Sequence, residues 1–360
     1  MKKLIYILLF LTLIIVLLPA EGTKEVEGTK EVERTLVIED TTGNIARMER
    51  IPERITFAGK SANMVADVLY MFPEAASRMV GVGTTNQGNG DFIKFLDPAY
   101  DTKTYLERNA GPEQIAVTRP ELVVMKNFLK KSLGDSISQL DIPVLYLNLE
   151  TPVAYEKDFK MLGKVFGNPE RAAELIQYYK NEKEFVTERT KALTEKPDIL
   201  FIYHTTRDGI TAFNIPPESW IQTRMVEMAG GNPVWTDIHP GGGWSKVNLE
   251  QIAAWNPDQI YVVAYKQDIN KVLNLMKESS EWKELEAVKN GKLTAFPVDF
   301  YSWDQPDSRW ILGLNWLAKQ IHPDLFADLD IPKLARNFFT ELYFLTDEQY
   351  ETEILSRLGW

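Results

Sequence analysis

The sequence predicts an α/β fold of two lobes, each with a parallel sheet, joined by one long α-helix and enclosing a ligand cleft. Three observations carry this prediction: strand and helix patterns alternate, one segment occurs twice, and a long amphipathic stretch separates the two copies. The segment is Glu-Gln-Ile-Ala, three residues, then Pro and an acid, at 113–121 and at 250–258. Two lobes built on one plan leave a cleft between them, and clefts bind ligands.

The N-terminus has the order of a secretory signal. Two lysines precede an apolar run at 4–18, and a Pro-Ala pair follows. We expect a signal peptide or an N-terminal anchor over 1–20. Residues 21–34 repeat Glu-Gly-Thr-Lys-Glu-Val in tandem, and this composition predicts a polar linker.

The N-terminal lobe is expected over 35–150. It should open with a β-hairpin, because Thr42-Gly43-Asn44 is a turn sequence between two strand patterns. Ser61 is a suitable N-cap for a helix with apolar residues at helical spacing. The other expected elements are strands at 55–58, 79–82, 122–125 and 143–147 and a helix at 112–118.

The connecting long helix is assigned to 151–195. Its clearest part, 168–193, carries apolar residues on or near one face, with no Gly or Pro after Pro169. At 1.5 Å per residue this part would run for about 36 Å. The C-terminal lobe is expected over 196–330 and a C-terminal helical extension over 331–360. Expected elements are strands at 199–203, 260–264 and 293–297 and helices at 220–230, 269–278, 282–287 and 307–320.

Charge and composition exclude several kinds of protein. The chain of 360 residues has a net charge of −11 and no strongly basic stripe, which argues against a nucleic-acid partner. It has no cysteine, which excludes disulfides, thiol nucleophiles, Cys-ligated metals and a lipid-modified cysteine.

Enzyme signatures are absent from the sequence. It has no Gly-x-Ser-x-Gly elbow, no phosphate loop and no His-Glu-x-x-His, so we predict no catalytic residue, no cofactor and no enzyme. His204 and His239 could hold a metal together with a carboxylate, but no tight ligand spacing supports this, and no metal ligand is assigned.

Candidate ligand contacts lie where strands meet helices. Lys60 and Ser61 at a helix N-terminus would suit an anionic group, with an ordinary cap and a solvated lysine as the alternative. Arg309 could clamp an oxyanion, or it could pair with Asp304 or Asp307. The remaining candidates are His204, which ends a strand, and three aromatic residues: Trp220, Trp244 and Trp303.

Four motifs together resemble one known family. They are Arg54-Ile55, Val80-Gly81-Val82-Gly83, both copies of the repeat, and Gly230-Gly231-Asn232. Over 35–325 the chain resembles the ABC-importer substrate-binding proteins of the ferric-siderophore, haem and vitamin B12 group. The resemblance implies two Rossmann-like lobes joined by a long helix, and a monomer that delivers a small ligand to a membrane permease.

The resemblance also implies roles for single residues. An aromatic residue six positions before the second repeat glutamate stacks on the ligand in vitamin B12 binders, and here that residue is Trp244. The matching position in the first lobe is not aromatic, but Tyr105 is close to it. Further implied ligand contacts are Thr84 and Thr85. The repeat glutamates, Glu113 and Glu250, are implied to dock onto the permease, with a solvated helix start as the alternative.

The expected ligand is an iron complex, a ferric siderophore or similar. Tryptophans favour a large ligand, while Lys60, His204 and Arg309 favour an anionic one, so a molybdate or tungstate oxyanion and cobalamin remain alternatives. An exported enzyme and a sensory ligand-binding domain are alternatives of other classes. The expected location is the periplasm or the outer face of the cytoplasmic membrane. A neighbouring permease gene would favour an importer over a sensor.

Overall fold

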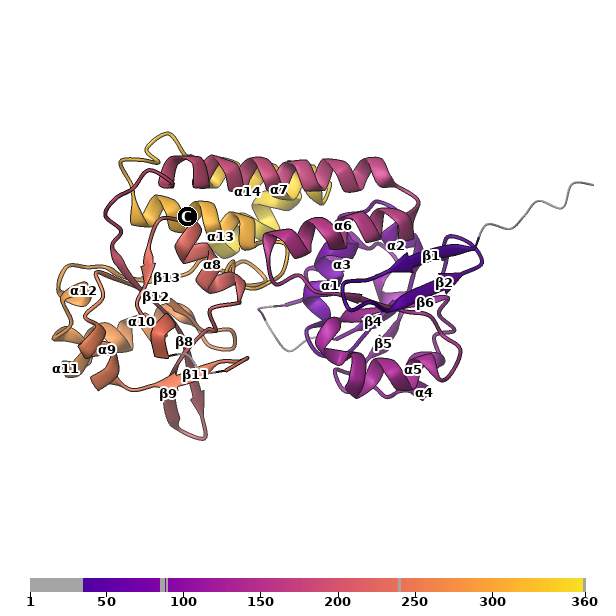
Figure 1. The fold of residues 1–360 in the computed structure, drawn as a ribbon, viewed down its shortest axis with the longest axis horizontal. Coiled ribbons are helices and arrows are strands. Elements are labelled where there is room, and N and C mark those ends of the chain that lie inside the picture. The colour runs from indigo at the N-terminus through magenta and orange to yellow at the C-terminus, as the bar shows by residue number, and fades with distance from the viewer. Residues whose placement is uncertain (1–34, 85–87, 89, 239–240, 359–360) are drawn as a thin grey trace, which may run out of the picture. The chain divides into compact units, whose positions relative to one another are not determined.

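A five-stranded parallel sheet forms the centre of the N-terminal lobe (Figure 1). The computed structural model describes residues 35–84, 88, 90–238 and 241–358, so the predicted signal segment and linker lie outside the described residues. The strand order is β5-β4-β3-β6-β7. The strands are β3 (Ile55–Phe57), β4 (Met79–Gly83), β5 (Thr104–Leu106), β6 (Leu122–Lys126) and β7 (Val144–Leu147). The helices are α1 (Ala62–Leu69), α2 (Ala75–Arg78), α3 (Ile93–Leu96), α4 (Pro112–Ala116) and α5 (Asp135–Ser138).

The expected N-terminal hairpin is present. Its strands, β1 (Leu36–Glu39) and β2 (Ile45–Met48), pair antiparallel around the predicted turn. Asp40 fixes this turn, because its Oδ1 accepts hydrogen bonds from the backbone N–H groups of Thr42 and Asn44 at 2.8 and 3.1 Å.

The C-terminal lobe has a mixed sheet of six strands. The order is β11-β9-β8-β12-β13, with β10 also paired to β8. The predicted parallel pairing is present among β8, β10, β12 and β13, and it fails at β9, which runs antiparallel to both of its neighbours, β8 and β11. The strands are β8 (Asp198–Arg207), β9 (Ile210–Ile215), β10 (Asn232–Pro233), β11 (Ser245–Val247), β12 (Gln259–Val263) and β13 (Leu293–Ala295). The helices are α8 (Ile221–Met228), α9 (Leu249–Trp255), α10 (Ile269–Glu278), α11 (Ser280–Lys283) and α12 (Glu286–Lys289).

The antiparallel strand β9 arises from a two-residue turn. Asp208 and Gly209 have φ of 52° and 77°, as a type I′ hairpin turn requires. Asp-Gly is a strong short-range hairpin signal, and it was present in the sequence. The strand predicted at 199–203 in fact continues to Arg207 and turns back into β9.

Both repeat copies fold as predicted, one in each lobe. The first forms α4 and β6, and the second forms α9 and β12. The closing acid of each copy fixes the start of its lobe's first sheet strand. Glu121 Oε2 accepts from the backbone N of Glu53 at 2.6 Å, and Asp258 Oδ2 accepts from that of Asp198 at 2.7 Å. The Pro-acid pair therefore has a structural role in addition to ending a helix.

Two helices, rather than one, occupy 151–195. They are α6 (Pro152–Phe166) and α7 (Pro169–Thr190), separated where Gly167 adopts a left-handed φ of 65°. The long helix α7 contacts both lobes. Near its start Arg171 Nε donates to the Met71 carbonyl at 3.0 Å, and at its end Thr190 Oγ1 donates to the Met228 carbonyl at 2.8 Å. Figure 1 shows α7 running alongside α13 and α14.

The C-terminal helices also contact both lobes. They are α13 (Trp310–Ile321), α14 (Ile331–Leu342), α15 (Asp347–Gln349) and α16 (Ser356–Leu358). After α14, the Tyr343 hydroxyl donates to the Asp67 carbonyl in α1 at 3.1 Å and contacts Ser308 Oγ at 2.5 Å. The chain therefore contacts the N-terminal lobe again just after α14, whereas Arg357 and Leu358 line a cavity together with Lys266 and Gln267 of the C-terminal lobe. Among the helices of the described ranges, none is long and apolar enough to cross a membrane.

Candidate functional site

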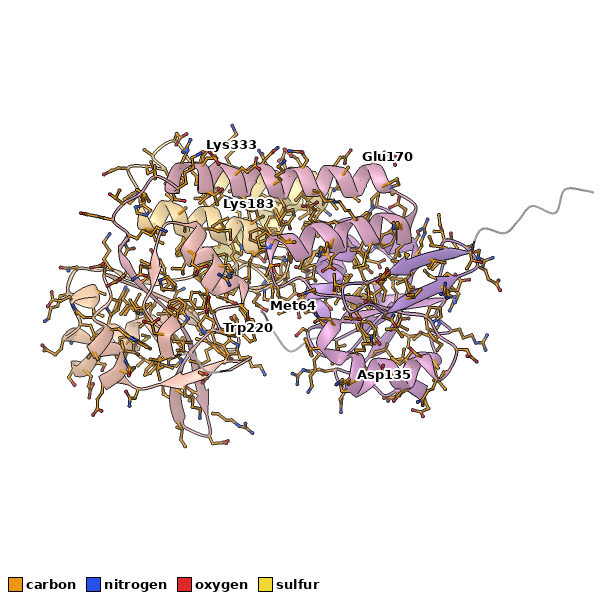
Figure 2. The ribbon with its side chains drawn as sticks, in the orientation of Figure 1. Met64, Asp135, Glu170, Lys183, Trp220 and Lys333 are labelled. Carbon is orange, nitrogen blue, oxygen red and sulfur yellow. The ribbon has the colours of Figure 1, made fainter. Side chains whose placement is uncertain are left out.

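A cavity of about 420 Å³ lies between the two lobes. The N-terminal lobe contributes Ser61, Met64, Lys126, Asn127, Phe128 and Glu150. The C-terminal lobe and the loop before α13 contribute Trp220, Gln222, Gly242, Trp244, Tyr265, Gln305 and Pro306. Met64 and Trp220, labelled in Figure 2, belong to the two sides. The volume lies within the range of small-molecule sites.

Aromatic side chains form the C-terminal side of the cavity. The ring of Trp244 lies 5.5 Å from that of Trp220 and 6.3 Å from that of Tyr265. The ring of Tyr203, in the central strand β8, lies 5.1 Å from the ring of Trp244. Trp244 directly precedes β11, which pairs with β9, and this pairing brings the indole over the sheet. These rings provide a large apolar surface for a ligand.

The N-terminal side carries an ion pair and an exposed ring. Lys126 ends β6, and its Nζ donates to the Asn148 carbonyl and, at 2.8 Å, to Glu150 Oε1. Phe128, two residues later, is 54% exposed. Sequence reasoning missed both residues, although the carboxyl ends of parallel strands are where α/β folds place ligand contacts.

Buried amides form part of the cavity lining. Gln222 Nε2 and the Tyr265 hydroxyl both donate to Asp304 Oδ2, at 3.2 and 2.5 Å. Burial raises the pKa of Asp304 to about 6. Gln305 is 2% exposed, and neither of its amide atoms has a hydrogen-bond partner in the described structure.

The structure brings three of the predicted site residues to this cavity: Ser61, Trp220 and Trp244. Ser61 occupies the N-cap position of α1, but its φ is 61° and its side chain makes no cap hydrogen bond, so the capping prediction is wrong. The neighbouring Lys60 is exposed and does not line the cavity.

Arg309 does not line the cavity, because it is fully buried between the lobes. Its Nη1 pairs with Asp67 Oδ2 in α1, and its Nε donates to Asp299 Oδ1 at 2.7 Å. Arg309 thus pairs with aspartates, but with Asp67 and Asp299 rather than with the predicted Asp304 or Asp307. Of the two predicted partners, Asp307 Oδ1 accepts from the Arg309 backbone N–H at 2.8 Å, and Asp304 Oδ2 accepts from Gln222 and Tyr265.

Trp303 is also buried rather than exposed. Its Nε1 donates to Asp299 Oδ2 at 2.9 Å, and its exposed fraction is 0%. A ligand in the cavity therefore cannot reach it. Its position in a loop suggested exposure, but the loop from 296 to 309 packs into the core.

His204 is buried on the other face of β8 from Tyr203. Its Nδ1 lies 2.8 Å from Gln267 Oε1, and its ring packs edge-on against Phe213. Successive residues of a strand point to opposite faces, which is why Tyr203 and not His204 reaches the aromatic cluster. In the described ranges no group of three or more His, Cys, Asp or Glu side chains could hold a metal ion. His239 lies outside those ranges.

The residues implied for the first lobe lie elsewhere. Thr84 lines a separate cavity of about 320 Å³ with Tyr100 and Tyr301, and its Oγ1 donates to the Leu106 carbonyl at 3.0 Å. Tyr105 is 45% exposed and lines neither this cavity nor the interlobe one. Thr85 lies outside the described residues.

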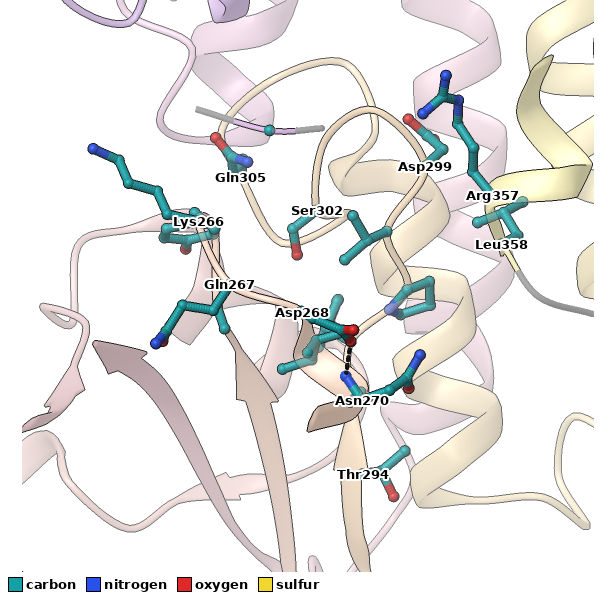
Figure 3. Close-up of a pocket in the computed structure, with 18 of the residues that line it drawn as sticks. Lys266, Gln267, Asp268, Asn270, Thr294, Asp299, Ser302, Gln305, Arg357 and Leu358 are labelled. Carbon is teal, nitrogen blue, oxygen red and sulfur yellow. Dashed lines mark hydrogen bonds between the residues drawn. The ribbon is translucent and has the colours of Figure 1, made fainter. Parts of the chain in front are cut away.

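A larger cavity, about 680 Å³, adjoins the ends of β12 and β13 and shares Tyr265 and Gln305 with the interlobe cavity. Figure 3 shows its polar lining, with Ser302 and Gln305 across from Asp268 and Asn270. Asp268 Oδ1 accepts from the Asn270 backbone N–H at 3.0 Å and thereby caps α10. This second cavity was not predicted.

Comparison with known proteins identifies the family. The family model described as "Periplasmic binding protein" matches residues 59–299, more than half of the 360 residues. The chain belongs to the periplasmic binding protein family. The resemblance stated from the sequence is thereby confirmed: this is a solute-binding protein of the ABC-importer type, and membership implies an exported protein.

Curated relatives of this periplasmic binding protein differ in ligand. It is 22% identical over 253 residues to the molybdate-binding protein MolA of Haemophilus influenzae, covering 64% of this chain and 69% of MolA. It is 22% identical over 271 residues to the iron(3+)-hydroxamate-binding protein YxeB of Bacillus subtilis, covering 73% of this chain and 79% of YxeB.

Solved structures show the same fold. A periplasmic solute binding protein from Veillonella parvula superposes with a TM-score of 0.73 at 22% identity, over 90% of this chain and 98% of that one. This likeness confirms the prediction of a two-lobed α/β fold. At such low identity the likeness shows the fold alone.

Proposed function

We propose that this periplasmic binding protein captures an iron complex, a ferric siderophore or similar, between its lobes and delivers it to a membrane permease. The observation that carries the proposal is the aromatic-sided cavity of about 420 Å³. A cavity of this size with a broad apolar side suits a bulky ligand better than a small oxyanion. The iron(3+)-hydroxamate-binding relative supports the same ligand class.

Delivery requires a contact with the permease. Glu113 and Glu250 are exposed in the first turns of α4 and α9, one in each lobe. We propose that they are the docking residues. The protein acts as a monomer in the periplasm or on the outer face of the cytoplasmic membrane, and it binds its ligand without converting it.

A molybdate or tungstate oxyanion is the second candidate. Ser61 lines the cavity at the N-terminus of α1, and helix N-termini favour anions. The molybdate-binding relative belongs to the same family.

Native mass spectrometry with elemental analysis tests the proposal. The purified protein is incubated separately with ferric trihydroxamate, ferric tricatecholate, haem, cobalamin, molybdate and tungstate. We expect one ferric complex to bind at one per chain and to be recovered chemically unchanged. Exclusive binding of an oxyanion or of cobalamin would replace the iron proposal, and chemical conversion of the ligand would indicate an enzyme.

A further inference from the structure

Gln305 presents an unpaired amide at the wall that the two large cavities share. It is 2% exposed, lines both cavities, and its Nε2 and Oε1 lack partners in the described structure. Buried polar groups in folded proteins are nearly always hydrogen-bonded, and an unsatisfied one costs free energy. Both amide atoms of Gln305 are covered in this structure, so a bond to an occupant of either cavity requires the side chain to turn toward that cavity.

Gln222 adds a second unpaired atom on the same side. Its Nε2 donates a hydrogen bond to Asp304, while its Oε1 has no partner among the described residues. It is also 2% exposed and lines the interlobe cavity. Together the two amides offer one N–H donor group and two carbonyl acceptors, an arrangement that recognises a ligand carrying both donors and acceptors.

The described lining carries no uncompensated positive charge. Its only charged side chains are Lys126 and Glu150, which pair with each other at 2.8 Å. The two cationic residues predicted for the site, Lys60 and Arg309, do not line this cavity. Lys60 is exposed, and Arg309 is buried, where it pairs with Asp67 and Asp299. The Asp304 carboxylate, which accepts a hydrogen bond from Gln222 Nε2, would repel an anion in the cavity.

We infer that the ligand is an uncharged ferric complex, recognised through hydrogen bonds to Gln305 and Gln222 rather than through ion pairs. This inference rests on the proposed function and names the ligand class within it. Three hydroxamates cancel the charge of Fe³⁺, so a ferric trihydroxamate can be neutral. Three catecholates leave three negative charges, and burying such an anion without a cation is unfavourable.

Replacing Gln305 with leucine tests the role of the amide. For Gln305→Leu we expect the affinity for a neutral ferric trihydroxamate to fall at least about tenfold, as a lost buried hydrogen bond predicts. The melting temperature should stay the same or rise, because the variant removes an unsatisfied polar group. Unchanged affinity, or a lowered melting temperature with the affinity loss, would overturn the inference.

The matched control is Gln320→Leu. Gln320 lines the second cavity but not the interlobe one, so its variant should bind the neutral complex like the wild type. An equal loss of affinity in both variants would count against a specific role for Gln305.

Ligand charge is tested separately by calorimetric titration with a neutral ferric trihydroxamate and with ferric tricatecholate. We expect the wild type to bind the neutral complex at least about tenfold more tightly, and Gln305→Lys to reduce this preference. Preference of the wild type for the tricatecholate would overturn this inference and leave the proposed iron function standing. Binding of no iron complex at all would overturn both.

Discussion

Trp244 shows how one side chain acquires a role from its place in the chain. It precedes a three-residue strand that pairs with β9, and this pairing puts its ring within 5.1 Å of Tyr203 and 5.5 Å of Trp220. It is half-buried, so one side packs on the sheet while the other faces the cavity. Aromatic residues placed in this way dominate many binding sites.

Trp244→Ala should weaken ligand binding at least about tenfold, because it removes the centre of the aromatic side. Tryptophan fluorescence titration with the ligand found by mass spectrometry measures the change. Trp255→Ala is the matched control, since Trp255 is also half-buried but lies in α9 and outside the interlobe cavity. Equal affinities for the wild type and Trp244→Ala would remove Trp244 from the site.

At the scale of elements, the joint between α1 and the loop before α13 is unusual in its charge. Asp67, Asp299 and Asp307 surround one arginine, Arg309, and all four are fully buried. Burial raises the pKa of Asp67 to about 7 and, together with the charge of Asp67, raises that of Asp307. Ionising all three carboxylates around one cation in the interior is unfavourable in free energy, because like charges repel there.

This joint makes stability depend on pH. In the unfolded chain Asp67 has a pKa of about 3.9, whereas in the folded protein it is about 7. Between these values the folded protein retains a proton that the unfolded chain has released, so the free energy of unfolding falls as pH rises from about 4 to 7.

Asp67→Asn should flatten this dependence. The loss of unfolding free energy between about pH 5 and pH 7.5 should be smaller than in the wild type by on the order of 2 kcal/mol. Urea denaturation at several pH values provides the measurement. Asp324→Asn, at an exposed position, should keep the wild-type slope. A slope in Asp67→Asn as steep as that of the wild type would show that this carboxyl does not titrate in the joint.

At the scale of the whole molecule, the duplication gives each lobe the same exposed acid at the start of the same helix. On the proposal that both lobes dock onto a permease, the repeat has two separable roles. Its closing acids, Glu121 and Asp258, bond to backbone N–H groups at the first strand of each lobe. Its opening acids, Glu113 and Glu250, remain exposed and are available to a partner.

The double variant Glu113→Ala with Glu250→Ala should abolish ligand uptake by cells that express the permease, because the paired contacts are lost. Affinity of the purified variant for the ligand should be unchanged. Glu170→Ala is the control, since Glu170 is also an exposed acid in the first turn of a helix, α7, but outside the repeat (Figure 2). Normal uptake by the double variant would exclude the docking role.

Sequence reasoning predicted the elements better than it predicted the site. Strands β3, β4, β6 and β7 and the two repeat copies lie where periodicity placed them. In the C-terminal lobe it missed β9, although Asp208-Gly209 carried the turn signal. Of the predicted site residues, Ser61, Trp220 and Trp244 line the cavity, while Trp303 and Arg309 are in the interior.

The periodic elements, the two-lobed plan and the family could be predicted from the sequence, because these depend on local spacing and on a repeat that is visible in one chain. Which polar and aromatic groups are buried, and what they pair with, could be known only from the folded structure. Arg309 meets Asp67 across 242 positions, and Gln222 and Gln305 reach one cavity from α8 and from the loop before α13. Such contacts come from the packing of distant segments, and no local pattern records them.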